Sequence, residues 1–205
     1  MIHIEDNFFK DPFFVRNAAL KSTYEGAAAP ALFSKQIYNY PGYRCFDVPD
    51  IVSKNVLDNV RLICRDSSLK NSGDCISFQY ITKTFEEGMF HFDNESYICI
   101  IYLSLNSPVD SGTDVCDYGY DHNLDLPDID YKLKRSFFED PSNLIKRYRY
   151  GMMRKRLNSY FKPTVRVSNK FNRGLIFPGT HFHRAQNFFG TSVKDARLTL
   201  VGFFE

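Results

Sequence analysis

The spacing of the hydrophobic residues changes near Cys75, and this change constrains the fold more than any other feature of the chain. Before it, apolar residues recur at helical spacing, whereas after it most segments are short and rich in Ile, Val, Phe and Tyr. Twenty Phe, 13 Tyr and no Trp also favour a strand-based core over a helical bundle. At 205 residues the chain suits one domain, residues 1–205. We therefore expect an antiparallel sandwich or jelly roll, mainly β, with flanking helices.

Residues 1–70 are expected to form a helical support for the strands. Asp11-Pro12 is typical of a helix start, because the carboxylate can cap the helix and proline already has a helical φ. This helix is expected to end at Gly26. A second helix, capped by Asp50, is expected to reach Cys64, since its apolar residues recur at helical spacing.

Residues 75–205 are expected to form the jelly-roll core. The segment Tyr97–Leu105 is apolar almost throughout, which indicates a strand buried on both faces. A third helix is expected from a cap at Asp140-Pro141 to about Tyr160. The other expected strands are Cys75–Phe85, Thr113–Tyr118, Thr164–Ser168, Gly174–Phe177, His181–Phe189 and Arg197–Phe204.

A basic insert at about 132–173 interrupts the core strands. It holds 13 basic and two acidic residues, and five aspartates lie immediately before it, between Asp117 and Asp130. In its helix we expect the following residues to face inward: Leu144, Ile145, Tyr148, Met152 and Leu157. The cations are expected to lie mostly outside: Lys146, Arg147, Arg149, Arg154, Lys155 and Arg156.

The chain has no apolar run of membrane-spanning length and no signal-peptide pattern at Met1, so a cytoplasmic location without membrane contact is expected. Its cysteines are odd in number, widely spaced and never in a C-x-x-C arrangement, which argues against a disulfide framework and a zinc knuckle. We expect most of them to be small buried hydrophobic residues.

Three side chains offer metal ligands. His91 and Asp93 lie two residues apart, and this spacing in an extended backbone places both on one face. The pair alone is a weak signal, but a third ligand can come from His183 or His181. Two imidazoles and one carboxylate form the facial triad of non-haem Fe(II) oxygenases. Arg197 opens the last strand and could hold a carboxylate in bidentate fashion.

This order of residues resembles the Fe(II)- and 2-oxoglutarate-dependent dioxygenases, on the prolyl-hydroxylase-like side of that superfamily. The similarity covers about residues 75–204 and includes the motifs His91-Phe-Asp93-Asn94, Ile101-Tyr102-Leu103, Gly174-Leu-Ile-Phe177-Pro-Gly and His183-Arg-Ala. The segments around Asp11-Pro12 and Tyr40-Pro41-Gly42 resemble small stand-alone members from phages and bacteria. The gap from His183 to Arg197 is a few residues longer than in prolyl hydroxylases, and Thr113 replaces a family glycine.

The resemblance implies a double-stranded β-helix, the cupin-like jelly roll. It also implies Fe(II) bound by His91, Asp93 and His183, with 2-oxoglutarate held by Arg197 and Tyr102. The expected reaction is hydroxylation of a C–H bond with O₂, with release of succinate and CO₂; ascorbate is a possible support. His183 fits the distal ligand better than His181, because of its spacing to Ala185 and Arg197.

Two alternatives remain open from the residues. One is a non-enzymatic jelly-roll module that binds nucleic acid or another polyanion through the basic insert; the other is a cupin-like metalloenzyme that needs no Arg197. Nucleic-acid demethylases of the superfamily use a second Arg that is missing after Arg197. The run Asp117–Asp130 would also repel phosphates. We therefore expect a small-molecule or protein substrate rather than nucleic acid.

Overall fold

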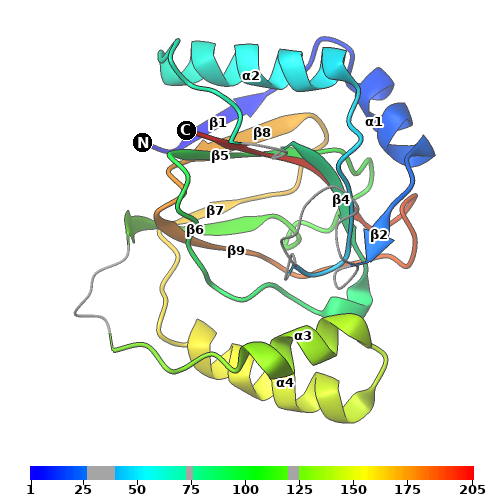
Figure 1. Ribbon diagram of the computed structural model, residues 1–205, viewed down its shortest axis with the longest axis vertical. Coiled ribbons are helices and arrows are strands. Elements are labelled where there is room, and N and C mark those ends of the chain that lie inside the picture. The colour runs from blue at the N-terminus through cyan, green and yellow to red at the C-terminus, as the bar shows by residue number, and fades with distance from the viewer. Residues whose placement is uncertain (27–39, 73–75, 120–124) are drawn as a thin grey trace.

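The computed structural model describes residues 1–26, 40–72, 76–119 and 125–205. Two antiparallel sheets lie one above the other (Figure 1). The larger has the order β1-β8-β5-β10-β4-β3-β2 and the smaller the order β7-β6-β9. The fold is the double-stranded β-helix that the sequence predicts. Its strands are β1 (His3–Asp6), β2 (Glu25–Gly26), β3 (Tyr43–Cys45), β4 (Ser77–Ile81), β5 (Tyr97–Tyr102), β6 (Thr113–Gly119), β7 (Val165–Val167), β8 (Arg173–Phe177), β9 (His181–Ala185) and β10 (Arg197–Phe204).

Strand β5 is buried on both faces, as expected, because it lies inside the larger sheet between β8 and β10. Its alternate residues serve different cores. Ile98, Ile100 and Tyr102 pack between the two sheets, with Val115 of β6 and Leu175 of β8. The intervening residues pack on the other side of the sheet, beneath the N-terminal helices.

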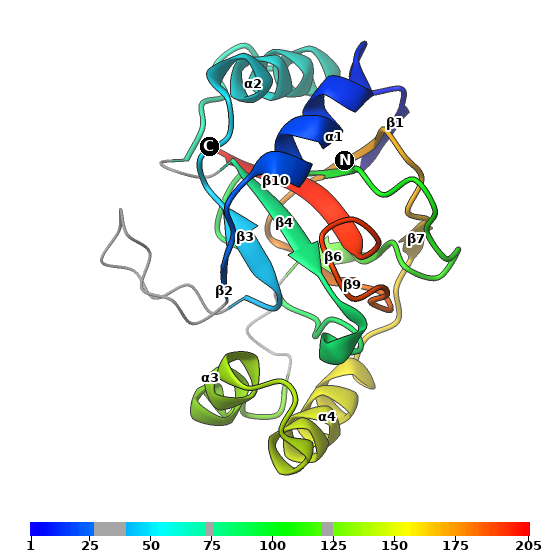
Figure 2. The same ribbon diagram turned by 90° about the vertical axis from the view of Figure 1, so that its right-hand side faces the viewer.

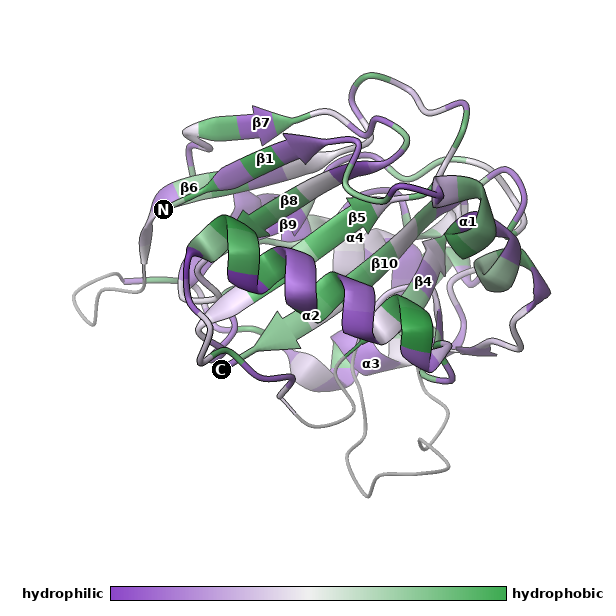
Figure 3. Ribbon diagram, turned by 90° about the horizontal axis from the view of Figure 1, so that it is seen from above, coloured by the Kyte–Doolittle hydropathy of each residue, from purple (hydrophilic) through white to green (hydrophobic). Residues whose placement is uncertain are grey.

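Helices α1 (Pro12–Lys21) and α2 (Asp50–Cys64) cover the outer face of the larger sheet (Figures 1 and 2). Figure 3 shows α2, in which hydrophilic and hydrophobic residues alternate, lying across strands that are mostly hydrophobic. Val52, Val56 and Val60 form the buried stripe of α2, at the helical spacing seen in the sequence.

The helix ends differ in part from expectation. Asp11 caps α1, since its side chain accepts a hydrogen bond from the Phe14 N–H, but α1 ends at Lys21 rather than at Gly26. Asp50 is not the cap of α2: it lies in the first turn and makes no capping hydrogen bond. Its carboxylate still suits that position, because it faces the positive end of the helix dipole.

Helices α3 (Tyr131–Glu139) and α4 (Leu144–Asn158) form the insert and lie beyond the smaller sheet, on the side opposite α1 and α2 (Figures 1 and 2). The sequence analysis missed α3, which Asp130 caps through the Leu133 N–H. The prediction that Asp140 caps the next helix is wrong, because Asp140 ends α3 and Asn143 caps α4.

The buried face of α4 is also not the expected one. Arg154 is 2% exposed, and Tyr150, Gly151 and Leu157 are buried with it. Four of the five residues predicted to face inward are exposed instead: Leu144, Ile145, Tyr148 and Met152. Arg154 turns inward because Glu86 and Glu87 lie there to pair with it.

Four cysteines, Cys45, Cys64, Cys99 and Cys116, are free thiols, and three of them are buried. This agrees with the expectation of small hydrophobic residues; Cys75 lies outside the described residues, as does Asp121 in the acidic run. No helix in the described part of the chain has both the length and the apolar character needed to cross a bilayer.

Candidate metal centre

His91, Asp93 and His183 converge at the end of the space between the two sheets, with their ligand atoms all within 4.8 Å of one another. The Nε2 atoms of His91 and His183 lie 3.9 and 3.4 Å from Oδ2 of Asp93. The backbones of His91 and His183 pair as an isolated β-bridge, with N–H···O distances of 3.1 and 2.8 Å in the two directions. The bridge explains how residues 92 positions apart in the chain come together.

Each imidazole is oriented by its own backbone. Nδ1 of His91 lies 2.9 Å from the Met89 carbonyl oxygen, and Nδ1 of His183 lies 3.0 Å from that of His181. A carbonyl can only accept, so each Nδ1 carries the proton and each Nε2 presents a lone pair toward Asp93. Metal-binding histidines are held in this way by hydrogen bonds from their second nitrogen.

The electrostatics favour an ionised carboxylate beside neutral imidazole. Desolvation and the neighbouring His183 lower the pKa of His91 to about 4. Desolvation raises the pKa of Asp93, but its interactions with His183, His91 and Arg44 outweigh this and place this pKa at about 2. At neutral pH these two groups therefore have the protonation states that metal binding requires.

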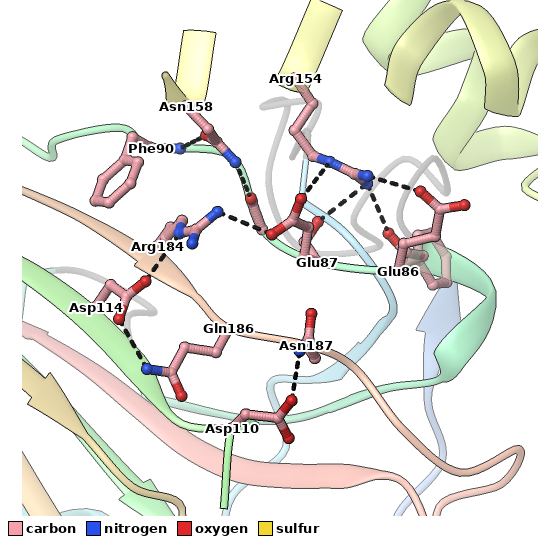
Figure 4. Close-up of polar contacts among 12 residues, drawn as sticks. Glu86, Glu87, Phe90, Asp110, Asp114, Arg154, Asn158, Arg184, Gln186 and Asn187 are labelled. Atoms are coloured by element: carbon pink, nitrogen blue, oxygen red, sulfur yellow. Dashed lines mark hydrogen bonds and ion pairs between the residues drawn. The ribbon is translucent and has the colours of Figure 1, made fainter. Parts of the chain in front are cut away.

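The segment that carries His91 is clamped against α4 (Figure 4). Asn158 accepts a hydrogen bond from the Phe90 N–H at 3.0 Å and donates one to the Gly88 carbonyl at 3.1 Å. Arg154 donates to Glu86 at 2.6 Å and to the carbonyls of residues 85 and 87 at 3.3 and 3.4 Å. Two side chains of the insert thus fix the backbone on the N-terminal side of His91.

The other side of this segment is held by β9, the strand of His183 (Figure 4). Arg184 donates to Glu87 at 2.8 Å and to the fully buried Asp114 of β6 at 3.0 Å. The Gly88 N–H donates to the Ala185 carbonyl at 3.0 Å. The ligand-bearing segment therefore lies between α4 and β9, each attached to it by charge-assisted hydrogen bonds.

Arg197 is buried at the start of β10, with 3% of its surface exposed. It donates to the Ser111 carbonyl at 3.2 Å and to Oγ1 of Thr113 at 3.3 Å. Among the described residues, no carboxylate lies within ion-pair distance of it. A buried guanidinium without a counter-charge is costly, so an anionic ligand fits here.

Tyr102 supports this position from β5. Its hydroxyl donates to Oγ1 of Thr113 at 2.7 Å, and its ring lies 5.6 Å below the Arg197 guanidinium. Burial raises the pKa of Tyr102, which keeps the phenol protonated. Thr113, which the sequence analysis noted only as a replacement for glycine, joins the two side chains and lines the cavity with Arg197.

One cavity of about 980 Å³ joins the two groups of residues, since His91, Asp93, His183, Thr113 and Arg197 all line it. This volume is at the upper end for small-molecule sites. Its wall also includes side chains that sequence reasoning did not identify: Tyr40, Arg44, Tyr131, Lys134, Phe138 and Tyr150. They come from the edge of the larger sheet and from the insert, and no local pattern connects them to the ligands.

His181 does not take part in this arrangement. Its side chain lies outside the group formed by His91, Asp93 and His183. Both His181 and His183 are on β9, but of these two only the ring of His183 lies beside the Asp93 carboxylate. Of the insert cations named above, Arg149, Lys155 and Arg156 are exposed, and none of the six lines the cavity.

The structure combines a double-stranded β-helix with two imidazoles and one carboxylate that lie close together, and known structures share this fold. Across 99% of the chain, its fold matches HygX from Streptomyces hygroscopicus, solved with nickel and 2-oxoglutarate bound, with a TM-score of 0.59, 13% identity and 82% of that chain covered. It also matches SnoN, described as a non-haem α-ketoglutarate-dependent epimerase from nogalamycin biosynthesis, with a TM-score of 0.54, 11% identity and 75% of that chain covered. No protein-family model and no curated protein matches the sequence.

Proposed function

We propose that this protein is an Fe(II)- and 2-oxoglutarate-dependent dioxygenase that hydroxylates a C–H bond of a small molecule. The observation that carries the proposal is the convergence of His91, Asp93 and His183 in a cavity that also contains a buried Arg197, which has no carboxylate partner in the part of the chain that the structure describes. The similarity of the fold to two 2-oxoglutarate-dependent proteins supports it. The finer placement, among small prolyl-hydroxylase-like members, rests on the sequence resemblance.

The donor set fits the metal. Two neutral imidazole nitrogens and one carboxylate suit Fe(II) and leave further coordination positions for a co-substrate and O₂. In this reading Fe(II) is held by His91, Asp93 and His183, and the distal carboxylate of 2-oxoglutarate by Arg197. When bound, these groups supply the oxidation, in which one oxygen atom of O₂ enters succinate, the other enters the hydroxyl group of the product, and CO₂ leaves.

The protein's own side chains position the reactants. Arg197 neutralises and orients the distal carboxylate, and Thr113 and Tyr102 hold the guanidinium in place through the contacts described above. The carbonyls of Met89 and His181 fix the imidazole rings, so that no ligand has to reorient when the metal binds.

Metal and co-substrate titrations test the proposal. Asp93→Ala and His183→Ala should abolish Mn(II) and Fe(II) binding while the protein stays folded, and His181→Ala is the matched control. Arg197→Ala should weaken 2-oxoglutarate binding at least tenfold, because a hydrogen bond to a charged partner contributes roughly 1.5–3 kcal/mol. Arg197→Lys keeps the charge without the bidentate geometry and should fall between the two.

Turnover provides the second measurement. With Fe(II), ascorbate and O₂, the wild type should convert 2-oxoglutarate slowly to succinate even without a prime substrate, and Asp93→Ala should not. Undiminished metal affinity in His183→Ala would exclude the proposed ligand set. Equal 2-oxoglutarate affinity in the wild type, Arg197→Lys and Arg197→Ala would exclude the role of Arg197.

A further inference from the structure

The cavity wall contributed by the insert includes a lysine that the proposed chemistry does not use. Lys134 of α3 is half-buried and lines the cavity with its neighbours Tyr131 and Phe138. Its ammonium lies 5.9 and 5.8 Å from the centroids of these two rings. Among the described residues it has no ion-pair partner and no side-chain hydrogen bond, and the charge that acts on it is that of Asp93.

A second cation, Arg44 of β3, lines the same cavity from the edge of the larger sheet. Its guanidinium lies 4.3 Å from the Tyr40 ring centroid, and its charge acts on Asp93 as that of Lys134 does. Two cations from different elements therefore lie near the metal-binding carboxylate, and neither belongs to the Arg197 end of the cavity.

Among the described residues, the charge of Lys134 is not matched by an ion pair. Under the proposed function, the charges of Fe(II), Asp93, the 2-oxoglutarate dianion and Arg197 cancel. Glu87 is paired with Arg154 and Arg184. Of the remaining charged residues that line the cavity, Lys134 is a cation without an ion-pair partner among the described residues. In the free protein, the negative charge of Asp93 acts on Lys134. A bound metal ion would neutralise Asp93, so Lys134 would then lack this compensating charge.

Many of the other residues that line the cavity are aromatic. Besides Tyr131 and Phe138, the lining rings come from β10, from α4 and from loops beside the sheets: Tyr40, Phe46, Phe92, Tyr150, Phe188 and Phe203. Rings of this kind bind flat or apolar bodies, while a few polar groups set orientation. A ligand that satisfies both features has an apolar body and one anionic group.

We propose that the prime substrate is a small organic anion with an apolar or aromatic body, whose acidic group is bound by Lys134, with Arg44 as the second cation of the site. This inference rests on the proposed function, because it assigns Arg197 to 2-oxoglutarate and leaves Lys134 for the substrate. It also explains what the insert contributes to the site: α3 supplies the cation and part of the aromatic wall.

The test compares two probes that differ only in charge, 2-naphthylacetate and its neutral amide. Their affinities are measured calorimetrically with the full chain, in Mn(II) and 2-oxoglutarate at concentrations that saturate each variant. The wild type should bind the acid at least tenfold more tightly than the amide, since one charge-assisted contact distinguishes them. Lys134→Met should lose this preference, Lys134→Arg should retain it, and Lys132→Met, which removes an exposed lysine of the same helix, should leave it unchanged.

The outcomes separate this inference from the proposed function. If the wild type binds Mn(II) and 2-oxoglutarate but does not prefer the acid, or if Lys134→Met keeps the preference, the inference is wrong and the proposed function stands. If the wild type binds neither metal nor 2-oxoglutarate, the proposed function fails and the assignment of Lys134 fails with it.

Discussion

Arg154→Met tests whether the insert holds the metal-binding segment. The substitution keeps most of the apolar stem of the buried side chain and removes the guanidinium. That group donates to Glu86 at 2.6 Å and to the carbonyl oxygens of Phe85 and Glu87, and its Nε lies 3.4 Å from the Glu87 carboxylate. All these contacts are with residues 85–87, which lie in the segment that leads to His91.

The expected loss of stability follows from what remains after the substitution. Removing one partner of a buried ion pair costs about 3–5 kcal/mol when the other charge is left alone. Here Glu86 keeps Arg147 and Glu87 keeps Arg184, and the Glu86 side chain is 33% exposed, so the stranded charge is smaller. We therefore expect a loss of about 2–3 kcal/mol, or about 4–12 °C in Tm for a chain of this size.

Arg147→Met is the matched control, because this half-exposed side chain pairs with the same carboxylate of Glu86 at 2.7 Å. A pair of this kind contributes up to about 1 kcal/mol. Urea unfolding of wild type and both variants measures the difference, and Mn(II) titration should show about tenfold weaker binding in Arg154→Met alone. If Arg154→Met is as stable as Arg147→Met, or binds Mn(II) like the wild type, the clamp does not act as described.

Two glycine substitutions and one pH series give the remaining predictions. Gly112→Ala should destabilise the protein by about 1–3 kcal/mol, because the new Cβ would lie 1.7 Å from the Val167 carbonyl oxygen. Gly151→Ala has room for a Cβ in α4 and should stabilise the protein by about 0.5–1 kcal/mol. Thermal melting compares the two variants. Desolvation raises the pKa of Glu86, but its hydrogen bonds with Arg154 and Arg147 outweigh this and lower it below 4.5, so this group adds stability above that pH and loses it on acidification. Urea unfolding from pH 6 to pH 3 should therefore show a smaller decline for Arg154→Met than for the wild type.

The sequence predicted the fold because strand patterns are strong, and it offered the candidate ligands because the weak His91–Asp93 signal was joined by the resemblance to a family. The apolar run of β5 and the full length of β10, Arg197–Phe204, could be read from composition and alternation. The candidate ligands are short motifs: His91 and Asp93 lie between β4 and β5, and His183 lies in the middle of β9. The strands β1, β2 and β3 were missed, since they are short and lie at or toward the edges of the larger sheet, where half-exposed residues give no clear pattern.

The insert was predicted less well because its structure depends on distant partners. Helix α4 has cations and apolar residues on every side, so its sequence allows two different faces to point inward. The buried face is selected by Glu86 and Glu87, which lie more than 60 positions from Arg154 in the chain. The helix α3 was missed since Asp130, its cap, looked like the last member of an acidic run. The role proposed for Lys134 depends on that helix, so it could not be inferred from sequence.

The jelly-roll strands and the insert contribute different residues to the candidate site. The jelly roll fixes Arg197 and His183 through β10 and β9, whose neighbours are other strands of the sheets. The insert touches the metal-binding segment through Arg154 and Asn158, and it lines the cavity through α3. A change in α3 would therefore alter which substrate fits without moving the strands that carry these two groups. A change at the α4 clamp would instead reach the proposed metal ligand His91 directly, and the two kinds of variant should separate substrate preference from metal affinity.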